Sequence, residues 1–273
     1  MTGFVSRMLK NLSHSTNDLA PLPESHPTFD KGSWNYIKIG TWWENQHFEW
    51  NAYSCGNAFV FGPPGSGKST VQHTVIQHCL HHSDQWQVMG IDIAGKTLVP
   101  YMTSATPLAG IATTVEEGVV LLRRVKEIML ERYAEMAETN SRLKMTDDVK
   151  RIMVVIDEVS DLMSPLPDTD EQEDTRLKEE AHRLLEELAR QSRAAGINLM
   201  VGGVNPWPSM SGEFRNNFFP VISLGDYDPT SGYNPTGNLN SLPELLASST
   251  TKGSGCITTL LGPSVFQTYL PSE

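Results

Sequence analysis

Eight residues in the first third of the chain combine glycine, lysine and serine at a spacing suited to binding phosphate. They read Gly62-Pro63-Pro64-Gly65-Ser66-Gly67-Lys68-Ser69 and match the pattern GxxxxGK[ST]. An apolar run at 58–61 precedes them and a helical pattern over 68–81 follows. In that context glycines let backbone N–H groups and the positive end of the helix point at phosphate oxygens. We therefore expect these eight residues, with Thr70, to bind a nucleotide. The alternative is a glycine-rich turn before an ordinary helix.

A second group of residues could complete the chemistry of hydrolysis. The apolar residues 152–156 run directly into Asp157 and Glu158, which is how a central parallel strand delivers carboxylates to its carboxyl end. An apolar run before Asp-Glu is common by itself, and its pairing with the glycine loop makes it informative. We expect Lys68 to neutralise β/γ-phosphate oxygens, and Ser69 and Asp157 to hold Mg²⁺. Glu158 would orient and deprotonate the attacking water.

These residues need a framework of alternating strands and helices. Periodicity predicts helices over 68–81, 115–136 and 175–195, the last closed by Gly196, and strands over 58–61, 87–93, 152–156, 198–201 and 220–224. Such alternation predicts parallel βαβ units, hence an α/β fold of the RecA-like P-loop type whose mainly parallel sheet is flanked by helices.

Smaller elements are expected at both ends of that framework. An aromatic stretch, 33–51, predicts a small N-terminal β extension with Gly40 and Glu44-Asn45 as turn candidates. Strands over 256–260 and 265–269 would form an antiparallel C-terminal edge. Residues 1–33 are rich in Ser, His, Pro and Asp and predict an arm or linker, which leaves 34–273 as the motor domain.

Composition narrows the class of protein. The 273 residues are 39% hydrophobic and carry a formal net charge of −11, so any contact with a polyanion must be local. The three cysteines form no CxxC pair, which argues against a disulfide framework or a zinc site. No apolar stretch reaches about 18 residues and no signal-peptide core is present, so we expect a cytoplasmic chain without a membrane span.

Several strings resemble the FtsK/SpoIIIE-like branch of the HerA/FtsK ATPases over about residues 35 to 271. VVIDEVSDLM (154–163) and ELARQSRAAGINLM (187–200) resemble the most specific of that family's motifs. Ile91-Asp92 with Lys96 is similar to its IDPK-type turn, and Glu131-Arg132-Tyr133 to its ERRY helix end. The resemblance implies an ATP- and Mg²⁺-dependent motor that forms a ring, most often a hexamer, and moves double-stranded DNA. A chain without flanking domains suggests a phage- or plasmid-type role in packaging, transfer or segregation.

The chain also departs from the family pattern. Ile93-Ala94-Gly95 replaces the usual proline, and the glutamine expected to sense the γ-phosphate is missing from Gly202-Gly203-Val204-Asn205-Pro206. Asn205 could substitute, because an amide can hydrogen-bond phosphate or water. Residues 225–230 are acidic where the family is basic. Two alternatives therefore stay open: a motor for protein secretion, and a nucleotide-binding module whose hydrolysis is impaired.

Ring assembly and DNA contact suggest further candidates. Arg190 and Arg193 could supply the positive group that a neighbouring subunit needs in the transition state, or could form an ordinary solvated helix face. Pore loops could lie in 142–151 and 207–217, which hold Arg142, Lys144, Lys150, Arg151, Trp207, Ser211, Arg215 and Asn216. Ordinary exposed loops are the alternative for both segments. Trp42, Trp43 and Trp50 could stack on bases, although tryptophans in a hairpin more often cover the sheet.

Overall fold

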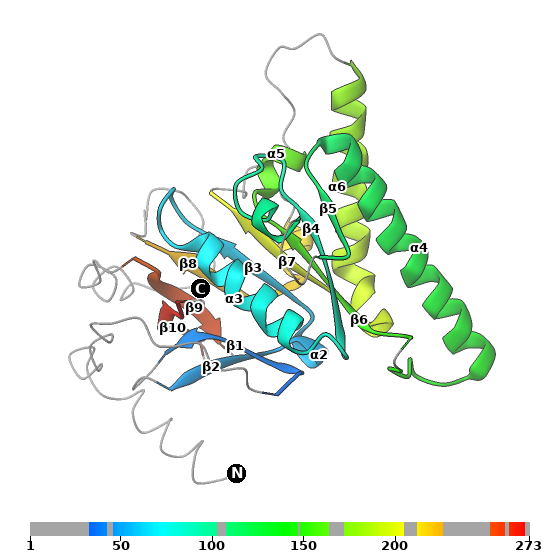
Figure 1. Cartoon of the computed structure of the whole chain (residues 1–273), viewed down its shortest axis with the longest axis horizontal. Coiled ribbons are helices and arrows are strands. Elements are labelled where there is room, and N and C mark those ends of the chain that lie inside the picture. The colour runs from blue at the N-terminus through cyan, green and yellow to red at the C-terminus, as the bar shows by residue number, and fades with distance from the viewer. Residues whose placement is uncertain are drawn as a thin grey trace.

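One mixed sheet forms the centre of the molecule (Figure 1). The computed structural model describes residues 33–42, 46–102, 108–146, 148–163, 172–204, 212–225, 252–259 and 262–270. Within these ranges the sheet has ten strands in the order β2-β1-β10-β9-β8-β3-β7-β6-β4-β5. The strands are β1 (Tyr36–Thr41), β2 (His47–Asn51), β3 (Asn57–Phe61), β4 (Trp86–Ile91), β5 (Gly110–Ala112), β6 (Arg151–Ile156), β7 (Ile197–Gly203), β8 (Phe218–Leu224), β9 (Ser254–Thr259) and β10 (Gly262–Thr268).

The sheet has a parallel half and an antiparallel half. Strands β8, β3, β7, β6, β4 and β5 are parallel neighbours, whereas β8–β9, β9–β10, β10–β1 and β1–β2 are antiparallel. The mainly parallel α/β fold, its N-terminal extension and its antiparallel edge are therefore confirmed. The proposed arm lies almost entirely outside the described residues, so the domain boundary stays a prediction.

Helices cover both faces of the parallel half. They are α2 (Ala52–Cys55), α3 (Lys68–His81), α4 (Val115–Thr139), α5 (Val159–Met163), α6 (Gln172–Gln191) and α7 (Gly212–Arg215), with 3₁₀ turns η3 (Val99–Met102) and η4 (Ser192–Ala195). Strand β6 shows how the two cores divide, because its side chains alternate between faces. Ile152, Val154 and Ile156 pack in the core that includes residues of α4 and α6. Met153 and Val155 pack on the other face, in the core that includes residues of α3.

The helix expected over 175–195 ends differently from the prediction. Leu184, Leu185 and Leu188 are buried as their spacing predicts, but the regular α-helix stops at Gln191 and continues as the 3₁₀ turn η4. Gly196 closes it in the left-handed conformation, with φ 70°. Arg190 and Arg193 therefore do not share one continuous α-helical face.

Two expectations at the edges of the sheet were wrong or incomplete. Gly40 is no turn residue: it lies within β1, next to a register shift, and pairs with Thr268 of β10. A Cβ atom there would come within 2.3 Å of the Gln267 carbonyl oxygen, so glycine is required by close packing. The short edge strand β5 was not predicted, since three residues give too little periodicity to detect.

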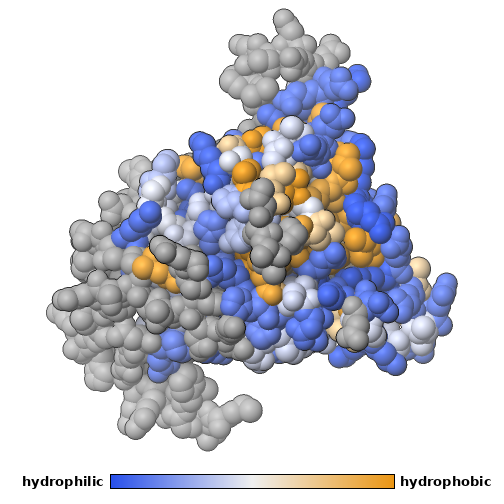
Figure 2. All heavy atoms as spheres, in the orientation of Figure 1, coloured by the Kyte–Doolittle hydropathy of each residue, from blue (hydrophilic) through white to orange (hydrophobic). Residues whose placement is uncertain are grey.

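Exposed hydrophobic side chains gather on one part of the face seen in Figure 2. Figure 2 shows them over η3, β5 and the first half of α4, where Met102 is 53% and Val120 is 56% exposed. Apolar surface of this kind commonly marks a site of protein contact. None of the helices in the described residues has the length and apolar character that a membrane span requires.

Candidate nucleotide-binding site

The glycine-rich loop joins β3 directly to α3, as the sequence predicts. Gly67 precedes the helix with φ 108° and Gly65 has φ 81°, values that glycine adopts at little cost. A Cβ atom on Gly65 would meet no atom within 4 Å, so the loop is open on that side. Lys68, Ser69 and Thr70 form the first turn of α3, where backbone N–H groups have no acceptor inside the helix. The loop can therefore receive an anion.

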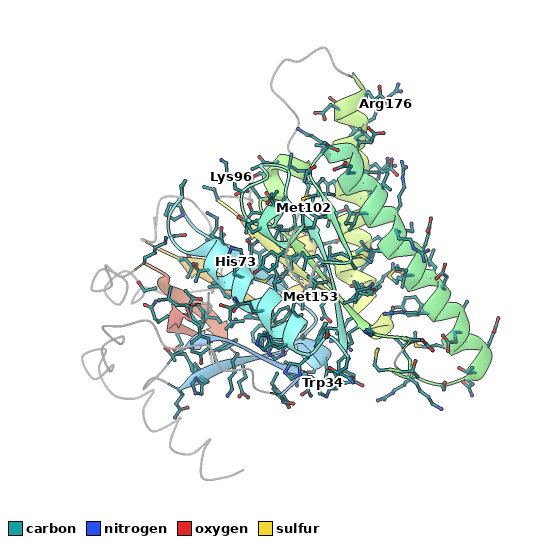
Figure 3. The ribbon with its side chains drawn as sticks, in the orientation of Figure 1. Trp34, His73, Lys96, Met102, Met153 and Arg176 are labelled. Atoms are coloured by element: carbon teal, nitrogen blue, oxygen red, sulfur yellow. The ribbon has the colours of Figure 1, made fainter. Side chains whose placement is uncertain are left out.

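The sheet brings the acidic pair to the same edge. Strand β7 lies between β3 and β6, and all three run parallel, so Asp157 and Glu158 leave the sheet at the end where the glycine loop begins. Gln72 on α3 fixes this relation, since its Nε2 donates to the Ile156 carbonyl oxygen at 2.9 Å. In Figure 3, Lys96 lies at this end of the molecule and Trp34 at the opposite end.

Lys68 folds back over its own loop. Its Nζ donates to the carbonyl oxygens of Gly62, at 2.8 Å, and Pro63, at 3.3 Å. Burial lowers its pKa, while the nearby carboxylates of Glu158 and Asp157 act in the opposite direction. A phosphate group entering the loop would offer the ammonium stronger, charged acceptors than these carbonyls.

Asp157 and Ser69, the two expected magnesium ligands, share a third residue. The Ser69 hydroxyl lies 3.1 Å from the Thr97 hydroxyl, and Thr97 also hydrogen-bonds the Asp157 side chain. The pKa of Asp157 is raised to about 6, chiefly by burial; the neighbouring Asp92 and Glu158 add to the shift, and Thr97 and Lys68 oppose it. Sequence reasoning missed Thr97, because a lone threonine after a turn carries no recognisable signal.

Asp92, at the end of β4, shapes the loop that carries Thr97. Its fully buried carboxylate accepts hydrogen bonds from the backbone N–H groups of Lys96, Thr97 and Leu98, at 3.2, 2.8 and 2.7 Å. Gly95 turns the chain with φ 65°. The family resemblance at Ile91-Asp92 and Lys96 pointed to this turn, and the structure shows that Asp92 organises it.

Glu158 is engaged by two groups at the end of β7 and the start of α5. Its Oε1 accepts from the Ser160 hydroxyl and, at 3.2 Å, from the backbone N–H of Val204. Asn205, which follows Val204 and is the candidate γ-phosphate sensor, lies outside the described residues, so its role stays a prediction.

The antiparallel half of the sheet also touches the glycine loop. The Gly253 N–H donates to the Ser66 carbonyl oxygen at 2.8 Å, and a Cβ atom on Gly67 would lie 2.9 Å from the Gly253 Cα. On the other side, a Cβ atom on Gly225 would lie 3.2 Å from the Pro63 ring. The loop is therefore held between the end of β8 and the turn before β9.

The residues at this edge fit a magnesium-bound nucleotide. Mg²⁺ commonly takes one or two carboxylates, with phosphate oxygens and water as its other ligands, and Asp157 with Ser69 offers that donor set. The described residues contain no cluster of three His, Cys, Asp or Glu that could hold a metal by protein ligands alone. Ser66 Oγ is buried without a hydrogen-bond partner in the described part of the chain, which leaves it available to a phosphate oxygen.

Comparison with known proteins agrees with this geometry. The FtsK/SpoIIIE family model matches residues 19–149. The curated DNA translocase FtsK of Caldanaerobacter subterraneus subsp. tengcongensis is 26% identical over 156 residues. Residues 19–149 of the chain are therefore similar to the FtsK/SpoIIIE family. The aligned region covers 54% of this chain and only 20% of that relative, so the activity of the longer protein does not pass to this chain by alignment.

Solved structures with a similar fold include a conjugation coupling protein and a pair of ATPase domains. The pCW3 conjugation coupling protein TcpA, solved with ATPγS, has a TM-score of 0.74 at 21% identity, covering 92% of this chain and 71% of that one. EssC ATPases 2 and 3 from Geobacillus thermodenitrificans also score 0.74, at 18% identity, covering 92% and 48%. At these identities the likeness shows the fold, and the RecA-like P-loop class is confirmed.

The two arginines proposed for an FtsK/SpoIIIE-type ring lie far from the chain's own glycine loop. Arg193 donates from Nη1 to the Ser54 carbonyl oxygen at 3.0 Å and packs beside Gly56, before β3 begins. Arg190 is exposed one turn earlier. A strand of five to seven residues separates the two edges by roughly 15–20 Å, so neither arginine reaches the site of its own subunit.

The candidate DNA-contact residues in 142–151 differ in how exposed their side chains are. Arg151 is 2% exposed between the rings of Tyr53 and Trp86, so its inclusion among exposed pore-loop cations was wrong. Lys150 donates to the Ser83 carbonyl oxygen at 2.8 Å, whereas Arg142 and Lys144 are exposed.

The second pore-loop candidate and the tryptophans have mixed outcomes. Residues 205–211 lie outside the described part of the chain, and Arg215 belongs to α7. Trp50 is 1% exposed and packs in the core, as the sheet-covering alternative expects. Trp42 packs edge-on against Phe48, and Trp43 lies outside the described residues.

Proposed function

We propose that this chain is an ATP-hydrolysing motor that translocates double-stranded DNA as a homo-oligomeric ring, most often a hexamer in motors of this type. One observation carries the hydrolytic part: Lys68 and Ser69 of the glycine loop meet Asp157 and Glu158 at the same edge of the sheet, close enough for the carboxylates to act on the lysine. The FtsK/SpoIIIE type supports the motor part.

The residues at this edge divide the work of hydrolysis. Water attacks the γ-phosphorus, Glu158 accepts a proton from that water, and the bond to the ADP oxygen breaks. The loop amides and Lys68 hold the β- and γ-phosphate oxygens. Ser69 and Asp157 would hold Mg²⁺, which supplies charge neutralisation at the phosphates.

Glu158 could be regulated through its present partners. Its contacts with Ser160 and Val204 both use Oε1, so they fix how the carboxylate is presented to water. The segment after Val204 leads toward the second pore-loop candidate, so DNA bound there could release Glu158. Asn205 is proposed to position the γ-phosphate or the attacking water.

The DNA substrate is supported by relatives. The curated match is a DNA translocase, and TcpA is a conjugation coupling protein. A phage- or plasmid-type role in packaging, transfer or segregation fits these, with Arg142 and Lys144 as exposed phosphate contacts. We place the motor in the cytoplasm, where ATP and DNA meet.

Among the described residues, Arg190 and Arg193 lie at the sheet edge opposite the glycine loop of the same chain, a position that suits action on a neighbouring subunit. We propose that Arg190 or Arg193 reaches the γ-phosphate of the adjacent subunit, where such a group is worth about 10³-fold or more in rate. The apolar surface over η3, β5 and α4 supports contact with a second copy.

A second candidate function is movement of protein. EssC has the same TM-score as TcpA, and the EccC type VII secretion ATPase of Thermomonospora curvata also shares the fold, with a TM-score of 0.68. An impaired nucleotide-binding module is a third candidate, motivated by the missing glutamine and by the engaged Glu158.

The test is ATP hydrolysis by the purified full chain, with and without long duplex DNA. We expect duplex DNA to raise turnover several-fold and Lys68→Ala to abolish nucleotide binding. Glu158→Gln should retain binding and lose turnover by about 10²-fold or more, because a general base contributes on that scale.

The outcomes separate the three candidates. ATP turnover that is the same with and without duplex DNA would contradict the DNA-translocase proposal and would leave the protein-secretion alternative. Binding without turnover in the unaltered chain would select the impaired module. Equal turnover in the Glu158→Gln variant would remove Glu158 from its proposed role.

A further inference from the structure

Thr97 occupies a position that links the two expected magnesium ligands. Thr97 is only 5% exposed, and its hydroxyl lies 3.1 Å from Ser69 Oγ. The Thr97 side chain also acts on the Asp157 carboxyl as a hydrogen-bond donor, which lowers the pKa of that carboxyl. We propose that Thr97 is a positioning residue of the magnesium site, which presents Ser69 and Asp157 to the metal in the correct orientation. This inference rests on the nucleotide binding that belongs to the proposed function.

The direction of these hydrogen bonds follows from the groups involved. An ionised carboxylate can only accept, so the Thr97 hydroxyl donates its single proton to Asp157. Thr97 can then only accept from Ser69, and Ser69 must donate to it. The chain of bonds therefore runs from Ser69 through Thr97 to Asp157.

This direction suits metal binding. A serine hydroxyl binds Mg²⁺ through an oxygen lone pair, so its proton must point elsewhere. The Thr97 oxygen accepts a hydrogen bond from the Ser69 hydroxyl, which leaves the Ser69 lone pairs free for the metal. It also holds the Asp157 carboxylate in one orientation, the task that outer partners perform in metal sites.

The loop around Thr97 is fixed before any metal arrives. The Asp92 carboxylate accepts from the Thr97 N–H at 2.8 Å and from its neighbours on both sides. Leu98 is completely buried and packs closely against Gly90. A Cβ atom added to Gly90 would lie 2.6 Å from Leu98 Cδ1. Thr97 could in principle be buried only to fill space in the core. Its hydroxyl, however, has the two expected metal ligands, Ser69 and Asp157, as its partners.

The test is Thr97→Val, which keeps the shape and removes the hydroxyl. Binding of a fluorescent, slowly hydrolysed ATP analogue is titrated with Mg²⁺, and separately measured in EDTA. We expect the Mg²⁺ concentration for half-maximal enhancement to rise about 10-fold or more, the usual effect of losing an outer partner. Binding in EDTA should stay within about twofold, because Lys68 and the loop amides are untouched. Thr97→Ser should restore the normal Mg²⁺ dependence.

Thr74→Val is the matched control. Thr74 is also fully buried, but its hydroxyl donates to the Thr70 carbonyl oxygen within α3, so its Mg²⁺ dependence should match that of the unaltered chain. Thermal unfolding reports whether each variant folds. If the valine variant does not, Thr97→Cys, which keeps a side chain of similar size with a weak hydrogen-bonding thiol, should show the same direction of shift.

An unaltered Mg²⁺ dependence in Thr97→Val, or in Thr97→Cys if the valine variant does not fold, would overturn the proposal, as would equal weakening of nucleotide binding with Mg²⁺ and in EDTA. Failure of the proposed function looks different. It would appear as loss of nucleotide binding, or of DNA stimulation, in the unaltered chain itself.

Discussion

At the scale of single residues, the carboxyl group of Asp157 is held under conditions that oppose its charge. Burial, with Asp92 and Glu158 nearby, raises its pKa to about 6, against an ordinary value of 3.8. A carboxyl with a raised pKa in the folded state binds more protons there than when unfolded. The free energy of unfolding therefore falls as pH rises from about 4 to about 6, and the cost persists above that range.

The variant Asp157→Asn removes this cost while keeping an oxygen that can accept from Thr97. Without nucleotide, we expect its melting temperature to exceed that of the unaltered chain by a few degrees at pH 8, with solvent screening limiting the gain. The difference should close near pH 4. Differential scanning fluorimetry across pH 4–8 measures it.

Addition of magnesium and an ATP analogue should reverse the order at pH 8, because only the carboxylate gains a metal partner. A melting-temperature difference that is constant across pH would show that Asp157 does not titrate in this range.

Residues with a sequence signature were the ones that could be predicted. The glycine loop and the acidic pair lie where their motifs place them. Thr97, Asp92 and Ser160 could not be assigned these contacts, because each acts across a turn or between elements that are separate in the sequence.

At the scale of elements, the contact between β7 and the end of β6 leaves no room for a side chain. A Cβ atom on Gly202 would lie 2.2 Å from the Asp157 carbonyl oxygen and 2.5 Å from Gln72 Nε2. We expect Gly202→Ala to lower stability by about 1–3 kcal/mol through overpacking. It should also weaken magnesium-dependent nucleotide binding by about 10-fold, because Asp157 must shift.

Gly110→Ala is the control for this prediction. Gly110 also lies in a strand of the same sheet, but a Cβ atom there meets nothing within 4 Å. Its thermal unfolding and nucleotide titration should match those of the unaltered chain. If both alanine variants bind nucleotide normally, close packing at Gly202 does not position Asp157.

Long periodic elements were predicted within a few residues of their observed bounds. Helix α3 spans 68–81 as expected, and α4 begins at Val115, where Thr114 and Glu117 form a capping box. Short or strained elements were not recovered. Strand β5 has three residues, η4 breaks the helical period, and Gly40 is explained only by the neighbouring strand.

At the scale of the whole molecule, the arginines and the hydrolytic residues lie at opposite edges of one sheet. If Arg190 and Arg193 act on the adjacent subunit, a ring of Arg190→Ala/Arg193→Ala subunits and a ring of Glu158→Gln subunits should both lack turnover. Mixed rings should regain it, because some interfaces combine an intact site with intact arginines.

Random mixing of equal amounts should restore roughly a quarter of normal turnover, the fraction of interfaces in which a subunit with intact Glu158 faces a neighbour with intact arginines. ATP hydrolysis after subunit exchange measures it. Arg183→Ala, an exposed arginine earlier on α6, serves as the control and should be active alone. Mixtures as inactive as their parents would contradict action between subunits.

Long-range pairing was the part of the architecture least accessible from sequence. Strands were expected in both terminal regions. The position of β1 between β2 and β10 was not expected. Periodicity reports which residues are buried and says little about which distant strand covers them.

The contacts of Gly225 and Gly253 with the glycine loop have a mechanical consequence. Gly225 follows β8 directly and Gly253 precedes β9, and both lie against the same few atoms of the glycine loop. A displacement of either strand end would therefore be passed straight to the atoms that hold the phosphates.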